Sequence, residues 1–119
     1  MSTTPVTGQP QIPLTPDVRT AYEQLYSHYE DAIENTADPA LLTSLLASQD
    51  AVAKVISLDN EAIIQQNSDA FAAVLKQMNA TNKGLSDLQD QIKKVAGNIN
   101  TFAGILSGIN EVFSLVPGI

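Results

Sequence analysis

The chain has 119 residues, of which 44% are hydrophobic and 5% aromatic, and it contains no cysteine. This length and hydrophobic content exclude wholesale disorder and fit one domain with a modest core, while the lack of cysteine excludes a disulfide framework. Thirteen acidic against six basic residues give a formal charge of −7, which argues against nucleic acid and anionic membrane surfaces as partners. The aliphatic composition, poor in aromatics, predicts an all-α protein.

Residues 1–14 are predicted to form an extended, proline-rich N-terminal tail, followed by a single helical domain over residues 15–119. Pro10, Pro13 and Pro16 recur every third residue, which is the period of polyproline II. We interpret the tail as a stiff leader; the alternative is a docking peptide for an SH3-like groove. The first residues lack the pattern of a signal peptide, so we expect a soluble protein that is cytoplasmic or exported by a route independent of a signal peptide.

Capping residues predict where the first two helices begin. Thr15 followed by Pro16, and Asp38 followed by Pro39, each combine a side chain that can accept from free backbone amides with a proline suited to the first turn. The first helix should end near Asn35. The connection to the second helix is then so short that the two helices must be antiparallel neighbours.

The second helix is predicted to continue to about residue 81. Its expected apolar face consists of Leu41, Leu42, Leu45, Leu46, Val52, Val55 and Ile56. The pattern slips at residues 59–61, which we interpret as a stutter because no Gly or Pro forces a break. Extending the later repeat backward places Asn60 and Asn67 at apolar positions. We favour a slipped frame that leaves both in water; the alternative is that they are buried and specify helix pairing.

From residue 71 to residue 116, apolar residues recur at alternating spacings of three and four, and Thr81 is the only polar member of the repeat. Such a repeat places one apolar stripe along a helix, and another helix must cover it. We call this stripe the seam and predict that it is the interaction surface. Its apolar members are Phe71, Val74, Met78, Leu85, Leu88, Ile92, Val95, Ile99, Phe102, Leu106, Ile109, Phe113 and Val116.

The architecture depends on whether the chain turns at residues 82–84. Gly84 could end a helix, and Ser86 and Gln89 have the spacing of a capping box, so we favour a turn. The fold would then be an antiparallel helical hairpin or bundle of three or four helices, with long coiled-coil-like C-terminal helices. Because the repeat crosses the site in phase, the alternative is one rod of about 70 residues that must oligomerise.

Glycines interrupt the outer face of the last predicted helix. Gly97, Gly104 and Gly108 fall at solvent positions of the repeat, and Glu111 is the only charged residue between residues 95 and 119. We expect a buried bundle helix that tolerates these glycines. There are two alternatives: the glycines allow close packing against another chain, or the segment is membrane-active.

No catalytic, cofactor or metal-binding motif is apparent, so we expect no enzyme, no cofactor and no small-molecule substrate. His28, the only histidine, is interpreted as a surface residue beside the apolar stripe. Tyr22, Tyr26 and Tyr29 are interpreted as packing residues with their hydroxyls at the rim. The acidic residues of segment 30–34 are interpreted as a solvated face, with a docking patch for a basic partner as the alternative.

These features predict a non-enzymatic structural or interaction module that packs with itself or with a protein partner through the helix over residues 85–116. One alternative is a membrane-active protein that inserts residues 95–119; another is a small acidic chaperone or adaptor for an exported cargo. Size, lack of cysteine and the hairpin pattern resemble small helical proteins that bacteria export. The chain has no Trp and so lacks the Trp-x-Gly turn of one such group. We carry no function over from this resemblance.

Overall fold

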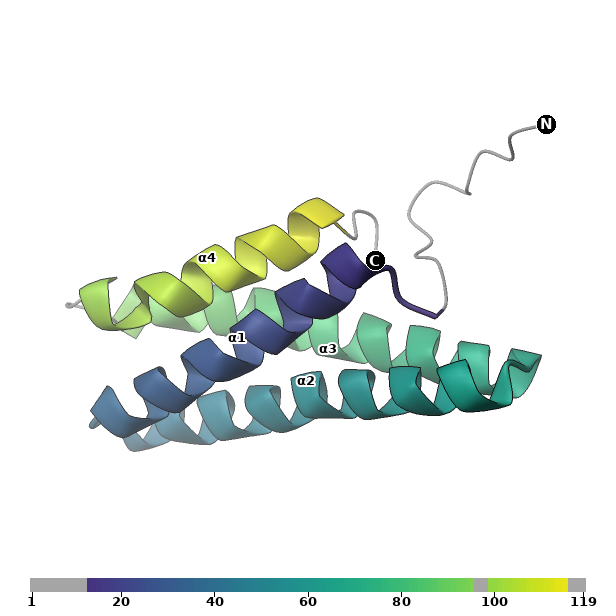
Figure 1. Ribbon diagram of the computed structural model, residues 1–119. Coiled ribbons are helices and arrows are strands. Elements are labelled where there is room, and N and C mark those ends of the chain that lie inside the picture. The colour runs from purple at the N-terminus through teal and green to yellow at the C-terminus, as the bar shows by residue number, and fades with distance from the viewer. Residues whose placement is uncertain (1–12, 96–98, 116–119) are drawn as a thin grey trace.

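The computed structural model describes residues 13–95 and 99–115, and over these residues the chain is an antiparallel bundle of four helices (Figure 1). The helices are α1 (Pro16–Asn35), α2 (Pro39–Gln65), α3 (Ser68–Val95) and α4 (Ile99–Leu115). Each helix packs on the next one in the chain, and α4 packs back on α1, which closes a ring of four. The predicted all-α bundle is therefore confirmed.

Both predicted helix starts are confirmed. The Thr15 side chain accepts a hydrogen bond from the backbone amide of Val18, and the Asp38 carboxylate accepts from the amides of Ala40 and Leu41. These bonds satisfy amides that have no partner inside their own helix. The short connection between the helices makes α1 and α2 antiparallel neighbours, as the sequence predicted.

Helix α2 runs without a break through the phase slip at residues 59–61, as predicted. The predicted continuation to about residue 81 is wrong, because α2 ends at Gln65. Gln66 takes a left-handed backbone conformation with φ of 48°, and the Asn67 side chain accepts from the Ala70 amide at 2.8 Å to cap α3. The capping bond helps to offset the roughly 1–2 kcal/mol that the left-handed conformation costs a residue with a side chain. Asn60 and Asn67 are both exposed, so the slipped frame is confirmed.

The predicted turn at residues 82–84 is also wrong, and so is the alternative of one rod. Helix α3 runs without a break through Gly84, and the chain reverses instead at Gln66 and Asn67. Leu85 and Leu88 are buried on the same face of α3 as the seam residues before them, so continuous packing outweighs the local signals for a turn. The boundary between α3 and α4 falls at residues 96–98, outside the described residues.

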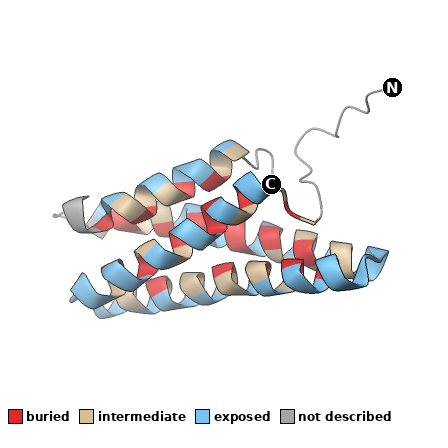
Figure 2. Cartoon of the chain, viewed as in Figure 1, coloured by how far each residue is buried: buried red, intermediate tan, exposed pale blue. Residues whose placement is uncertain are grey.

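The seam forms the inner face of α3 and contributes to that of α4 (Figure 2). Its fully or nearly fully buried members are Val74, Met78, Thr81, Leu85, Leu88, Ile92, Phe102 and Ile109, and its partly buried members are Phe71, Leu106 and Phe113. The side chains of Val95 and Ile99, and all of Val116, lie outside the described residues. The chain's own helices therefore cover the described part of the seam, which leaves the interaction surface to be found elsewhere.

Candidate functional site

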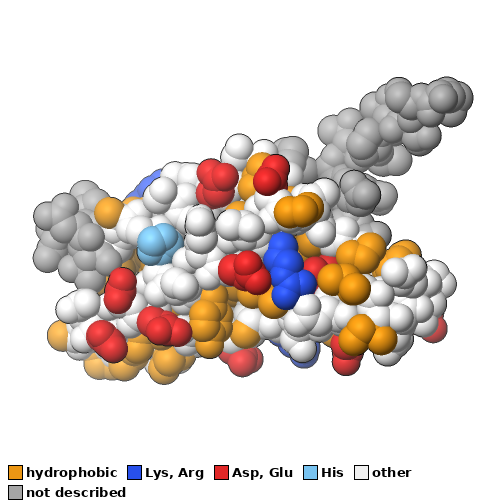
Figure 3. Space-filling model, in the orientation of Figure 1, with side chains coloured by type: hydrophobic (Ala, Val, Ile, Leu, Met, Phe, Trp, Pro, Cys, Tyr) orange, Lys and Arg blue, Asp and Glu red, His pale blue; other side chains and the backbone are white. Residues whose placement is uncertain are grey.

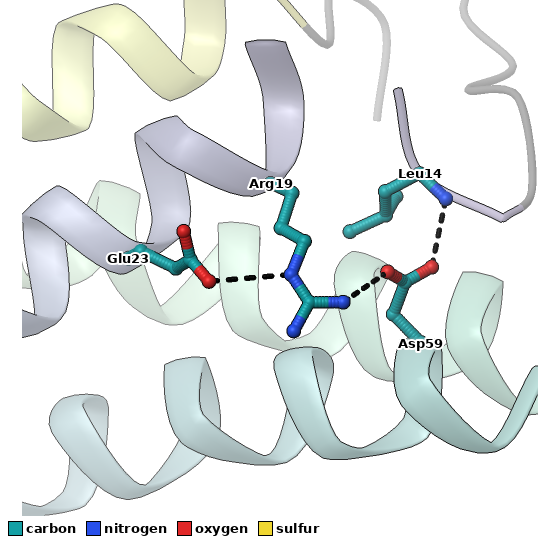
Figure 4. Close-up of polar contacts among 4 residues, drawn as sticks. All are labelled: Leu14, Arg19, Glu23 and Asp59. Atoms are coloured by element: carbon teal, nitrogen blue, oxygen red, sulfur yellow. Dashed lines mark hydrogen bonds and ion pairs between the residues drawn. The ribbon is translucent and has the colours of Figure 1, made fainter. Parts of the chain in front are cut away.

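The most deeply buried charged group is Asp59, which joins three segments of the chain (Figure 4). Its carboxylate accepts from the Leu14 backbone amide at 2.7 Å and from the Arg19 guanidinium at 3.1 Å, and Arg19 also binds Glu23 at 3.2 Å. Leu14 itself is buried, so this residue belongs to the core and not to the predicted tail. Residues 1–12 lie outside the described residues. Because both carboxylate oxygens of Asp59 have partners inside the chain, the cluster holds α1 on α2 and leaves no group free for chemistry.

The expectation that the tyrosine hydroxyls lie at the rim is wrong for Tyr22 and Tyr29, which are fully buried. The Tyr22 hydroxyl donates to Asn82 Oδ1 at 2.8 Å, and the Tyr29 hydroxyl shares a hydrogen bond with Ser48. Burial raises the pKa of both phenols well above the ordinary value, which keeps them neutral. They are therefore neutral hydrogen-bonding groups of the core and cannot act as bases near neutral pH.

Two of the predicted close-packing glycines lie against α1. A Cβ added at Gly104 would lie 2.6 Å from His28 Nδ1, and a Cβ added at Gly108 would lie 2.9 Å from Leu25 Cδ1. His28 is half-buried at the surface of α1 beside Gly104. The close partner of these glycines in this structure is thus a helix of the same chain, while Gly97 lies outside the described residues.

Within residues 13–95 and 99–115, no three His, Asp or Glu side chains are grouped so that they could hold a metal ion. A shallow groove of about 240 Å³ lies between α2 and α3. Its lining consists of Ser44, Ala47, Ser48, Ala51, Ala80, Thr81, Gly84, Asp87, Leu88 and Gln91. The Ser48 hydroxyl is bonded to Tyr29 and the Thr81 hydroxyl donates to the Ala51 carbonyl, so neither has a neighbouring base. The lining also contains the Ser44 hydroxyl and the Asp87 carboxylate, and no hydroxyl of the lining is hydrogen-bonded to that carboxylate.

Helix α2 carries the exposed apolar surface of the described residues. Leu46, Ile63 and Ile64 are 48%, 45% and 81% exposed, and they are the large hydrophobic side chains that solvent reaches most. Hydrophobic side chains follow the edge of the molecule formed by α2 (Figure 3). By length and composition α2 could span a membrane, and only 22% of its most apolar stretch is buried in the bundle. Sequence analysis assigned Leu46 to the buried face and gave no role to Ile63 and Ile64.

Acidic side chains of α1 border this apolar surface. Glu23, Glu30 and Glu34 are exposed and follow one another at steps of seven and four, which places them on one face of α1. Arg19 binds Glu23 and also Asp59 of α2, while Tyr29, about 100° around α1 from Glu30, bonds Ser48 of α2. The glutamate row therefore lies on the solvent flank of α1, beside its contact with α2. We define the α1–α2 face as Leu42, Leu46, Ala53 and Ile64 of α2 together with Glu23, Glu30 and Glu34 of α1.

No protein-family model, curated protein or solved structure matches this chain. The fold defines the class of the protein, an antiparallel four-helix bundle over the described residues, and the α1–α2 face is its best candidate site.

Proposed function

We propose that the protein is a non-enzymatic helical interaction module, and that the α1–α2 face is its binding surface. The observation that carries this proposal is the exposure of Leu46 and Ile64 on this face, in a bundle whose other large apolar side chains, among the described residues, are covered to a greater extent. Contiguous exposed apolar surface on a folded domain typically marks a contact with another molecule. Since the described part of the seam is covered by the chain's own helices, this face replaces it as the proposed working surface.

Site-specific photo-crosslinking tests the proposal. A photoreactive residue placed at position 64 should yield a discrete adduct, with a second copy or with another protein, in the native host. The same residue at position 83, an exposed position on α3, is the matched control and should yield none. Purified components should re-form the contact, and Leu46→Ser with Ile64→Ser should abolish it. Equal adducts at both positions, or none at position 64, would rule out this surface.

A second candidate function is membrane activity, supported by the apolarity and low burial of α2. The C-terminal segment suggested by the sequence is less available, because Phe102, Ile105, Ile109 and Val112 of α4 are buried in the bundle. Leakage of a dye from neutral phosphatidylcholine vesicles tests this candidate. Leakage that Ile64→Glu abolishes would support it, and intact vesicles at every pH tested would end it.

A further inference from the structure

Resting on the proposed function above, we infer that the partner of the α1–α2 face is a basic amphipathic helix: one with a stripe of large aliphatic side chains and with Lys or Arg along its flank. The juxtaposition of an exposed apolar strip on α2 with a row of carboxylates on α1 points to this partner. Such a helix would lie along α2, in the manner of an amphipathic helix docked on an apolar surface.

The apolar strip has the length and straightness that a helix requires. Leu46 and Ile64 are 18 residues apart, which is five full turns, so they lie on one line along α2 about 27 Å long. Leu42 and Ala53 lie within about 40° of that line at 100° per residue. The exposed polar residues Ser57 and Asn60 lie on the same line between Ala53 and Ile64, so the strip is apolar at both ends and polar over this interval. The α2 residues that line the groove with α3, such as Ser44 and Ala51, lie on the opposite flank. The strip therefore faces outward beside α1, and a docked helix of about 20 residues would cover it.

The charge next to the strip has one sign. Since α1 and α2 run antiparallel, Glu30 and Glu34 lie beside the end of the strip that contains Leu42 and Leu46. Arg19 is the only Lys or Arg of α1, and both Glu23 and Asp59 already bind its guanidinium. Figure 3 shows acidic side chains above the hydrophobic edge at this end of the molecule.

Across the strip, the outer surface of α2 carries both signs of charge. Asp50, Lys54 and Glu61 are exposed there, so this surface carries one net negative charge. The net field at the α1–α2 face is therefore negative, and it selects a cationic partner over an anionic or neutral one. Two copies joined through α2 would instead bring their acidic rows close together, because antiparallel pairing places like flanks side by side.

Binding of designed helical peptides to the full-length protein tests the inference. The probe is a peptide of about 20 residues with a leucine stripe flanked by lysines. Its controls are the same peptide flanked by glutamates and a lysine peptide of identical composition in scrambled order. Fluorescence anisotropy would give the affinities at low and at physiological salt. We expect the lysine-flanked helix to bind at least tenfold more tightly than either control, and added salt to weaken its binding.

Variants of the protein assign the contact to the face. Leu46→Ser with Ile64→Ser, and separately Glu23→Gln with Glu30→Gln and Glu34→Gln, should each weaken binding at least tenfold. Ala80→Gln in the α2–α3 groove is the matched control and should not change it. Circular dichroism and thermal unfolding verify that every variant is folded.

Three results would overturn the inference. Equal binding of lysine- and glutamate-flanked helices that is lost in Leu46→Ser with Ile64→Ser would show a docking face without the inferred charge selection, and the proposed function would stand. Binding that is lost only in the Glu→Gln variant would show plain charge attraction. Equally tight binding of the scrambled lysine peptide would show the same. Failure of every peptide would also reject a basic helix as partner, and the crosslink at position 64 would then decide the proposed function separately.

Discussion

Tyr22 and Asn82 form a hydrogen bond of 2.8 Å between α1 and α3, two helices that are not neighbours in the ring. Both side chains are buried, and within the described residues the Asn82 Nδ2 group has no partner. The bond thus crosses the centre of the bundle and fixes how the two helix pairs meet. The unsatisfied Asn82 Nδ2 group lowers the stability of the fold, because a buried donor has lost its hydrogen bonds to water.

Removal of one partner of this bond should therefore destabilise the protein, and removal of both should destabilise it much less. Tyr22→Phe leaves the Asn82 amide without any partner, which should lower the free energy of unfolding by about 1–3 kcal/mol. Tyr22→Phe combined with Asn82→Leu removes every unsatisfied group at nearly constant volume and should recover most of that loss. Urea unfolding of the two variants and the parent measures both effects. A double variant less stable than Tyr22→Phe would contradict the explanation.

The Asp59 cluster should respond unequally to loss of its two charges. Arg19→Met leaves the fully buried Asp59 carboxylate without its cation, for which we expect a loss of about 3–5 kcal/mol. Asp59→Asn retains an acceptor for the Leu14 amide, and Arg19, which is partly exposed, can still bind Glu23. We therefore expect Asp59→Asn to cost less than Arg19→Met. Denaturant unfolding of both variants gives the order of their stabilities. The reverse order would show that Arg19 contributes little to the stabilisation of the buried Asp59 carboxylate.

Local sequence signals correctly predicted where α1 and α2 begin and where α1 ends, but not where α2 ends and α3 begins. Thr15 and Asp38 cap their helices because each side chain bonds amides only two or three residues away, which spacing alone reveals. The predicted turn at Gly84 and the predicted helix through Gln66 were both wrong, because packing over the whole length of α3 determines where the chain reverses. Gln66 has none of the usual preference of Gly or Asn for a left-handed conformation. The residue-level signal at this turn is Asn67, a favourable N-cap residue that sequence analysis did not interpret as one.

The candidate face was only partly visible in the sequence. Periodicity placed Leu41, Leu42, Leu45 and Leu46 together on one apolar face, whereas the bundle buries Leu41 and Leu45 and exposes Leu46. Adjacent residues on a helix point about 100° apart. Helix α2 has neighbours on only two sides, so they cover one residue of each adjacent leucine pair more fully than the other. The burial of Asp59 could not be predicted, because its partners lie 40 and 45 residues away in the sequence.

Alkaline pH should weaken the fold through the buried tyrosines. Burial raises the pKa of Tyr22 and Tyr29 above the ordinary value of 10.0, so the unfolded chain loses these protons first as the pH rises. Their contribution to stability is complete below pH 10 and is lost above it, by about 1.4 kcal/mol per tyrosine at about pH 11. Urea unfolding at about pH 9 and pH 11 measures the loss. The variant with both tyrosines replaced by phenylalanine is the control and should show a smaller decrease; an equal decrease would contradict the assignment.

Alanine at three glycines should have opposite effects according to what surrounds each one. No atom lies within 4 Å of a Cβ added at Gly84, so Gly84→Ala should stabilise α3 by about 0.5–1 kcal/mol through the unfolded state. At Gly108 the new Cβ would lie 2.9 Å from Leu25 Cδ1 in the core, and the repacking should cost about 1–3 kcal/mol.

Gly104→Ala should fall between these two variants. The added Cβ would lie 2.6 Å from His28 Nδ1, but His28 is only half-buried and its ring can move toward solvent. Thermal unfolding of the three variants should therefore give the stability order Gly84→Ala, then Gly104→Ala, then Gly108→Ala. A Gly108→Ala protein as stable as Gly84→Ala would show that α4 does not approach α1 as closely as described, and would remove the reason for glycine at that position.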